Sequence, residues 1–142
     1  MINVVISITE LQKKIDSAEN ILLYQPLPDE PNILNEVVIH EDKSIYYAPK
    51  NKSVDPVFFA KQITTRISGN VLMLIPGTKF DNLGNRQGHG GGWYDRLLEK
   101  APGEWVKIGI CKPDNYQAEP LANLKPWDQP MDYVVVIDDT ID

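Results

Sequence analysis

The sequence predicts an α/β fold, a three-layer α/β/α sandwich around a mostly parallel sheet, with residues 1–142 forming one domain. Helix-like and strand-like segments alternate along the chain, as expected for a sheet that helices cover on both faces. Runs such as VLMLI at 71–75 and YVVVI at 133–137 are continuously apolar, which is typical of strands buried on both faces. A chain of 142 residues is long enough for one compact core and too short to suggest two.

The first fifty residues are expected to form two helices and two strands. A serine and a glutamate three residues apart have the spacing of a capping box, which predicts a helix at 8–19. The apolar run NILLYQ at 20–25 indicates a buried strand. The segment PNILNEVVIHED at 31–42 could form a short helix, and SIYYAP at 44–49 is a β-rich run that ends at a proline.

The rest of the chain continues the alternation. The Asp-Pro start of DPVFFAKQITTRIS predicts a helix at 55–68, and the strand NVLMLIP follows at 70–76. After a glycine-rich loop, a helix is expected at about 91–100 and the strand WVKIGIC at 105–111. Residues 112–131 hold four prolines and show no periodicity, so we expect an ordered loop over the surface or the site before the last strand.

Composition and charge exclude several classes of partner. The formal charge is −6 and the 14 Lys and Arg residues form no dense cluster, which argues against binding of nucleic acid. The longest apolar runs are far too short to span a membrane, and the N-terminus lacks the features of a secretion signal, so a cytoplasmic location is expected. Cys111 is the single cysteine and is expected to be a buried thiol. The oligomeric state stays open.

The stretch GNRQGHGGGWYDRLL at 84–98 is the most unusual part of the chain, because five of the nine glycines lie at 84–92. Neither the dinucleotide-binding fingerprint nor the P-loop pattern fits its spacing. Residues without a Cβ nevertheless let backbone N–H groups converge on phosphate oxygens, and the helix expected next would point its free N–H groups at the same place. A surface loop whose glycines only serve turns is the alternative.

Three polar side chains in this stretch are candidates for chemistry, each with a structural alternative. Arg86 could bind phosphate in a bidentate way or form a surface salt bridge. Asp95 offers the hard oxygen ligand that Mg²⁺ prefers, or could interact with the dipole of the helix that it begins. His89 could donate to a phosphate or face solvent, whereas no functional role is expected for His40.

The segment IPGTKFDNLGNRQGHGGGWYDRLL resembles the 5-formyltetrahydrofolate cyclo-ligase family, also called methenyltetrahydrofolate synthetase. That family has a Pro-Gly-x-x-Phe-Asp turn followed by Gly-x-Arg-Leu-Gly-x-Gly-x-Gly-Tyr-Tyr-Asp. Gln87 replaces the usual leucine and Trp93 the first tyrosine. The residues that match are Pro76, Gly77, Phe80, Asp81, Gly84, Arg86, Gly88, Gly90, Gly92, Tyr94 and Asp95.

Two weaker similarities extend the resemblance to about residues 20–139. NEVVIHEDKSIYYAP resembles a family helix that bears a glutamate, here Glu36, followed by a strand ending in proline. KPWDQPMDYVVV resembles a histidine-aspartate turn before the last strand, with Trp127 in place of the histidine and Asp128 retained. A family helix rich in Lys and Arg, which helps to hold ATP phosphates, has no evident match; only Lys13 and Lys14 could stand in for it.

The resemblance implies that ATP and Mg²⁺ drive the conversion of 5-formyltetrahydrofolate to 5,10-methenyltetrahydrofolate, with ADP and phosphate as products. Arg86 and Tyr94 would be catalytic, Asp95 would hold magnesium, and Trp93 with Tyr94 could form an aromatic wall for the pterin. The residues implied to bind ATP are Arg86, Gln87, Gly88, His89, Gly90, Gly91, Gly92, Trp93 and Tyr94. Those implied to bind the folate are Glu36, His89, Gly90, Gly91, Gly92 and Trp93.

Three functions remain open on this basis. The first is an ATP-dependent cyclo-ligase with a small folate substrate. The second is a catalytically inactive module that keeps the anion-binding loop and binds a nucleotide, a folate or a sugar phosphate. The third is a different enzyme on the same scaffold.

Overall fold

The computed structural model describes residues 3–88 and 91–138. Its main sheet has five parallel strands in the order β2-β1-β3-β6-β8. The strands are β1 (Asn20–Leu23), β2 (Ser44–Tyr47), β3 (Val71–Ile75), β6 (Val106–Cys111) and β8 (Tyr133–Val136). The all-parallel sheet and the five strands at the expected places confirm the fold class that the apolar runs predict.

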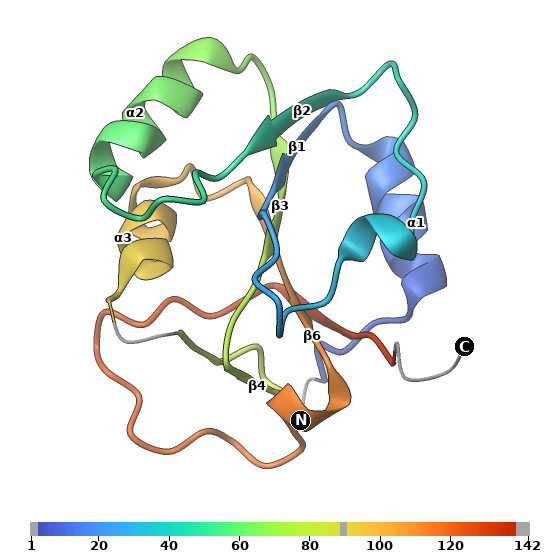
Figure 1. Ribbon diagram of the computed structural model, residues 1–142, viewed down its shortest axis with the longest axis vertical. Helices are drawn as coiled ribbons and strands as arrows, with labels where there is room; N and C mark the ends of the chain where they lie inside the picture. Colours follow the sequence, from blue (N-terminus) through green and yellow to red (C-terminus); the bar gives the residue numbers. More distant parts are fainter. Residues whose placement is uncertain (1–2, 89–90, 139–142) are drawn as a thin grey trace.

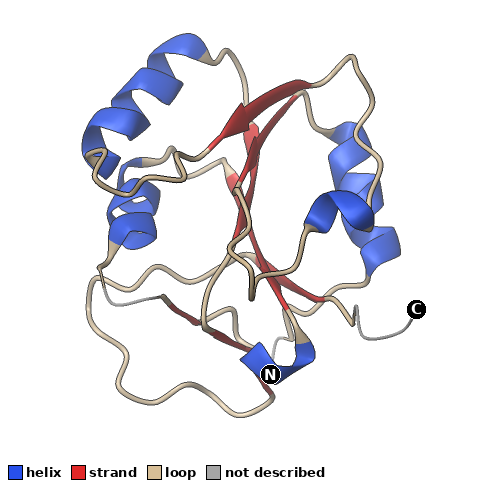
Figure 2. Cartoon of the chain, viewed as in Figure 1, coloured by secondary structure: helices blue, strands red, loops and turns tan. Residues whose placement is uncertain are grey.

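Helices cover both faces of this sheet. α2 (Pro56–Arg66) and α3 (Trp93–Lys100) lie on one side, whereas α1 (Ile8–Ser17) and the short 3-10 helix η1 (Ile33–Asn35) lie on the other. Figure 2 shows the strands between these two layers of helices. The three-layer sandwich is therefore confirmed, and the long apolar strands are explained by burial on both faces.

Side chains that alternate between the two faces of the sheet divide the core into two clusters. Met73 in β3 packs with the α2 and α3 side, whereas its neighbours Leu72 and Leu74 pack with α1 and η1. α1 contributes Leu11 and Ile15, which are fully buried, and its N-terminus carries the predicted capping box. Because successive strand residues point to opposite faces, each apolar run serves both halves of the core.

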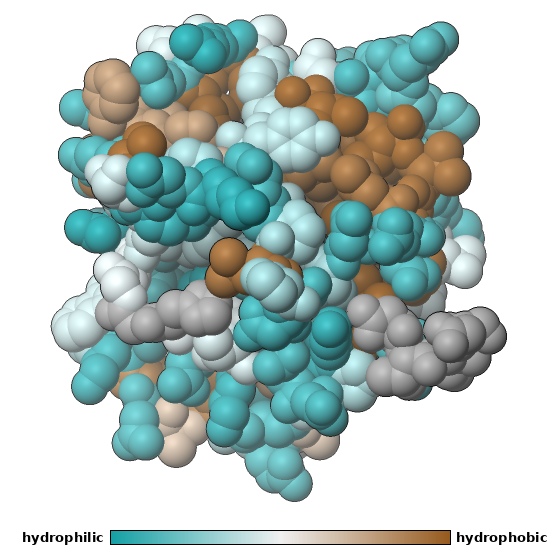
Figure 3. Space-filling view, viewed as in Figure 1, coloured by the Kyte–Doolittle hydropathy of each residue, from teal (hydrophilic) through white to brown (hydrophobic). Residues whose placement is uncertain are grey.

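The segment 31–42 differs from the expected helix, because only Ile33–Asn35 is helical and forms a 3-10 turn capped by the Asn32 side chain. Three consecutive β-branched residues, Val37, Val38 and Ile39, follow it and disfavour continuation of a helix. Figure 3 shows apolar side chains gathered on the side of the molecule where α1 and η1 lie. The exposed large apolar residues include Leu34, Val38 and Ile45.

A second, three-stranded sheet was not predicted. Its order is β5-β4-β7, from β4 (Lys79–Asp81), β5 (Arg86–Gln87) and β7 (Tyr116–Gln117). The strand β7 and the 3-10 helix η2 (Pro113–Asn115) both lie in the stretch 112–131, which is thus an ordered loop as expected. Short strands of two or three residues give no periodic signal in a sequence.

Buried Asp81 ties the small sheet to that long loop. Its carboxylate accepts hydrogen bonds from the backbone N–H groups of Leu83 (2.9 Å), Asn85 (3.0 Å) and Leu121 (2.8 Å). Gly84 has a left-handed φ of 89°, and a Cβ there would meet the Met131 backbone, whose N–H donates to the Gly84 carbonyl at 2.6 Å. These bonds fix the turn that leads to Arg86.

None of the helices in the described ranges is long and apolar enough to cross a membrane.

Candidate functional site

A pocket of about 460 Å³ lies between the glycine segment and the long loop. It opens beyond the carboxyl end of β3, where α/β sheets commonly bind ligands. One wall comes from the segment before and at the start of α3, and the other from residues 122–128. The lining residues are Lys52, Arg86, Gln87, Gly88, Gly91, Gly92, Trp93, Tyr94, Asp95, Ala122, Asn123, Leu124, Lys125, Trp127 and Asp128.

Arg86 supports the glycine segment from beneath. It is only 4% exposed, and its Nε donates to the Pro76 carbonyl at 2.7 Å, which leaves the two terminal nitrogens as the remaining donors. Burial lowers the pKa of Arg86, while the nearby Asp95 and Tyr94 act in the opposite direction. Arg86 is therefore a buried positive charge in a fixed position at the base of the pocket, and not the surface salt bridge that was the alternative.

Three glycines of the segment leave the pocket open. A Cβ at Gly88 would lie 3.1 Å from both terminal nitrogens of Arg86, whereas a Cβ at Gly91 or Gly92 would meet no atom within 4 Å. Gly92 is the N-cap of α3 in a left-handed conformation, with φ 68° and no capping side chain. The start of α3 thus lines the pocket with two residues that have no side chain, and the first N–H groups of a helix have no partner within it, as an anion site requires.

Asp95 lies beside a second carboxylate, that of Asp128. Asp95 is 7% exposed, and its Oδ1 accepts the Gln129 backbone N–H at 3.1 Å. Burial raises the pKa of Asp95; the Gln129 bond and the Arg86 charge lower it, and the adjacent Asp128 carboxyl raises it again. Two neighbouring carboxylates match what Mg²⁺ usually takes from a protein, which is one or two carboxylates.

Trp93 and Tyr94 are buried against the helix layer. The Trp93 indole N–H donates to the Val54 carbonyl at 2.8 Å, and the two rings meet edge to face with centroids 5.0 Å apart. The Lys52 ammonium lies 4.7 Å from the Trp93 ring centre and 5.2 Å from that of Tyr94, and it donates to the Pro49 carbonyl. Burial lowers the pKa of Lys52 and raises that of Tyr94.

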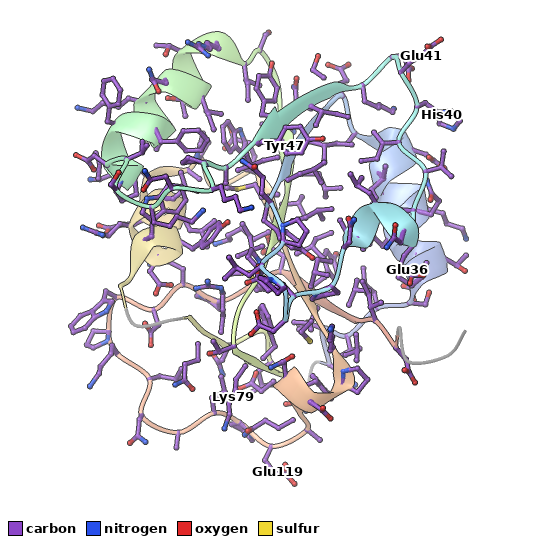
Figure 4. The ribbon with its side chains drawn as sticks, viewed as in Figure 1. Glu36, His40, Glu41, Tyr47, Lys79 and Glu119 are labelled. Carbon is purple, nitrogen blue, oxygen red and sulfur yellow. The ribbon has the colours of Figure 1, made fainter. Side chains whose placement is uncertain are left out.

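Some predicted residues lie elsewhere. Glu36 is exposed at the end of η1, on the side of the sheet opposite α3, and does not line the pocket (Figure 4). Lys13 and Lys14 line a separate groove at the amino ends of β3, β6 and β8, so they cannot serve the glycine segment. His40 is exposed, as Figure 4 also shows. His89 and Gly90 lie outside the described residues.

The sequence interpretation missed several pocket residues. Lys52 follows β2, and Asn123 and Lys125 lie in the loop 112–131, far in sequence from the glycines. Asn123 has a left-handed φ of 61°, a conformation that is uncommon for non-glycine residues and that asparagine adopts more readily than most. Asp128 was noted only as a retained family residue. The prolines of its loop, which indicate an ordered segment, are the signal that could have marked it as a candidate pocket residue.

Within the ranges that the structure describes, no group of three or more His, Cys, Asp and Glu side chains forms a ready metal site. Asp95 and Asp128 alone suit an ion that completes its shell with water and phosphate oxygens, as Mg²⁺ does. They do not suit zinc, which takes nitrogen and sulfur ligands in a closed tetrahedral site.

Comparison with known proteins gives consistent matches. The model of the 5-formyltetrahydrofolate cyclo-ligase family matches residues 6–137. A 5-formyltetrahydrofolate cyclo-ligase from Mycoplasma pneumoniae is 29% identical over 123 residues, which cover 82% of this chain and 72% of that protein. One from Haemophilus influenzae is 34% identical over 68 residues, which cover 46% of this chain and 34% of that protein.

A solved structure has the same fold. The 5,10-methenyltetrahydrofolate synthetase from Mycoplasma pneumoniae superposes with a TM-score of 0.58 at 23% identity, over 93% of this chain and 79% of that one.

Proposed function

This chain belongs to the 5-formyltetrahydrofolate cyclo-ligase family, and we propose that it catalyses the family reaction. In that reaction ATP and Mg²⁺ drive conversion of 5-formyltetrahydrofolate to 5,10-methenyltetrahydrofolate, and ADP and phosphate are released. The observation that supports this most directly is the pocket itself, because Arg86, Gly88, Gly91, Gly92 and Asp95 line one cavity. A cytoplasmic location and a single domain stay predictions.

Phosphoryl transfer mainly requires alignment of the groups and neutralisation of phosphate charge. Gln87, Gly88, Gly91 and Gly92 would hold the phosphates through backbone N–H groups, together with the free N-terminus of α3. Arg86 would direct its two terminal nitrogens to the same oxygens from below. Lys52 and Lys125 add positive charge at the rim, since both line the pocket.

Asp95 and Asp128 would hold the magnesium ion. When bound there, the ion neutralises phosphate charge and fixes the orientation of the phosphate chain. Burial and the adjacent Asp128 carboxyl raise the pKa of Asp95, and a divalent cation bound by the two residues would offset the repulsion between them. The two residues thus have a physical reason to bind a cation at neutral pH.

Tyr94 would act as a hydrogen-bond donor, not as a base. Burial raises the pKa of its phenol, so the hydroxyl keeps its proton at neutral pH, and the Arg86 guanidinium carbon lies 5.1 Å from the centre of its ring. Trp93 would fix the start of α3 beside the folate. The proposed contact of Glu36 with the folate stays a prediction, because its carboxylate is exposed outside this pocket.

The test is a turnover assay with the purified protein, Mg-ATP and 5-formyltetrahydrofolate. We expect the near-ultraviolet absorbance of the methenyl product to develop, with ADP formed in equal amount. The matched control is Asp95→Asn, which removes one carboxylate charge and should abolish turnover. Absence of product with the folded wild-type protein, at saturating levels of both substrates, would contradict the proposal.

The location of Lys13 and Lys14 favours a second candidate function. Their groove is separate from the glycine pocket, so the Lys and Arg residues lining that pocket, of those described, are Arg86, Lys52 and Lys125. Phosphoryl transfer relies on neutralisation of phosphate charge, so a pocket with few cations also fits a catalytically inactive module that binds a nucleotide or another phosphate ligand. Magnesium-dependent nucleotide binding without any turnover would select this alternative.

A further inference from the structure

Three aromatic side chains line the glycine pocket, and they differ sharply in exposure. Trp93 is 7% exposed and Tyr94 8%, whereas Trp127 is 59% exposed. A large apolar ring in water is unfavourable unless something covers it for part of the time. Trp127 is thus the described pocket aromatic whose ring is still accessible to a ligand.

The two buried rings have lost their free faces to the protein itself. The Lys52 ammonium lies over both Trp93 and Tyr94, and the Arg86 guanidinium lies over Tyr94 at 5.1 Å. The edge of one ring meets the face of the other. The aromatic wall that the sequence assigned to this pair is therefore already occupied by side chains of the chain.

Trp127 is held on an anchored turn at the opposite wall. The Asp128 N–H donates to the Lys125 carbonyl at 3.0 Å, and the Lys125 N–H donates to the Asp128 carboxylate at 2.7 Å. Pro126 occupies the second position of this turn, where its fixed φ is favoured. The next N–H, of Gln129, donates to Asp95, so the turn is tied directly to the candidate metal ligand.

We propose that the exposed indole of Trp127 is the stacking surface for the planar nitrogen heterocycle of the bound ligand. The inference rests on the proposed function, because both a purine carried by a triphosphate and the pterin of a folate supply such a ring. The anionic part lies against the glycine segment and the ring lies at the pocket mouth, beside Leu124, which is also exposed. Stacking on an aromatic face is tolerant of ring identity, so the shared chemistry is the heterocycle.

The experiment measures dissociation constants by calorimetry for three probes: Mg-ATP, 5-formyltetrahydrofolate and inorganic triphosphate with magnesium. The variants are Trp127→Ala and Trp127→Phe, with Leu83→Ala as a control at an exposed apolar residue that does not line the pocket. We expect Trp127→Ala to weaken binding of one of the two ring-bearing probes by about tenfold. Trp127→Phe should retain most of that affinity, and inorganic triphosphate should bind equally to all variants. The ring-bearing probe that is affected identifies which heterocycle stacks.

Intrinsic fluorescence provides a second readout, because Trp93 and Trp105 are buried and Trp127 is exposed. The stacking ligand should quench emission of the wild type and of Trp105→Phe but not of Trp127→Phe. Equal affinity of Trp127→Ala and wild type for both ring-bearing probes would overturn the inference and leave the proposed function standing. A parallel loss of triphosphate binding would also overturn it, since the turn rather than the ring would then be responsible. Failure of the wild type to bind any probe would overturn both proposals.

Discussion

Replacement of Gly109 by alanine tests how the small sheet is seated on the main one. Gly109 lies in the middle of β6, paired with Ile75 of β3 on one side and with Val134 of β8 on the other. A Cβ there would lie 2.7 Å from Cδ1 and 3.0 Å from Cζ of Phe80, and closer still to Cε1. Phe80 is fully buried in β4, next to Arg86 of β5 in the register.

The size of the effect follows from this geometry. Favourable carbon-carbon contacts begin at about 3.5 Å, so the added methyl overlaps the ring by about 0.8 Å at Cδ1 alone. Neither partner can move freely, since β6 is bonded on both sides and the ring has no exposed surface. Overpacking typically costs about 1 to 3 kcal/mol, and we expect Gly109→Ala to reach the upper end, about 3 kcal/mol.

Urea unfolding, followed by far-ultraviolet circular dichroism, measures the change in free energy of unfolding. The matched control is Gly103→Ala, where a Cβ meets no atom within 4 Å and the change should stay within about 0.5 kcal/mol. Phe80→Leu should destabilise the wild type but cost less in the Gly109→Ala background, because it removes the overlap. Equal stability of the two alanine variants, with additive effects of Phe80→Leu, would refute the reasoning.

The remaining predictions concern the pocket and the thiol. Because burial raises the pKa of Asp95 in the folded chain, its stabilising effect is present at low pH and is lost as pH rises through that pKa. Asp95→Asn should therefore gain stability relative to wild type between acidic and neutral pH, as urea titrations at several pH values can measure, and should lose magnesium-dependent nucleotide binding. Gly88→Ala should displace Arg86 and weaken triphosphate binding in calorimetry. Gly91→Ala should leave the free energy of unfolding within about 0.5 kcal/mol of wild type, because its Cβ meets only open space. Equal stability and equal binding of the two variants would argue against the role of Gly88. Burial raises the pKa of the Cys111 thiol to about 12, so an aromatic disulfide reagent should label it only in the unfolded protein, and rapid labelling of the native protein would contradict this.

Local patterns of the sequence determined the layers of this fold. The capping box began α1 where expected, and the apolar runs became the five parallel strands. The glycine segment likewise predicted a pocket wall that includes Arg86 and Asp95, because a run of residues without side chains can be read directly from the sequence. Periodicity and residue type report on neighbours along the chain, and these features depend on such neighbours.

Tertiary contacts decided the rest of the site. Lys52, Trp127 and Asp128 reach the glycines from segments more than thirty residues away, and no local pattern encodes that approach. The burial of Trp93 depends on the Val54 carbonyl and on Phe59, both supplied by the segment that follows β2. The sequence can thus name groups able to bind a polyphosphate, but only the packing of distant loops determines which rings and charges face it.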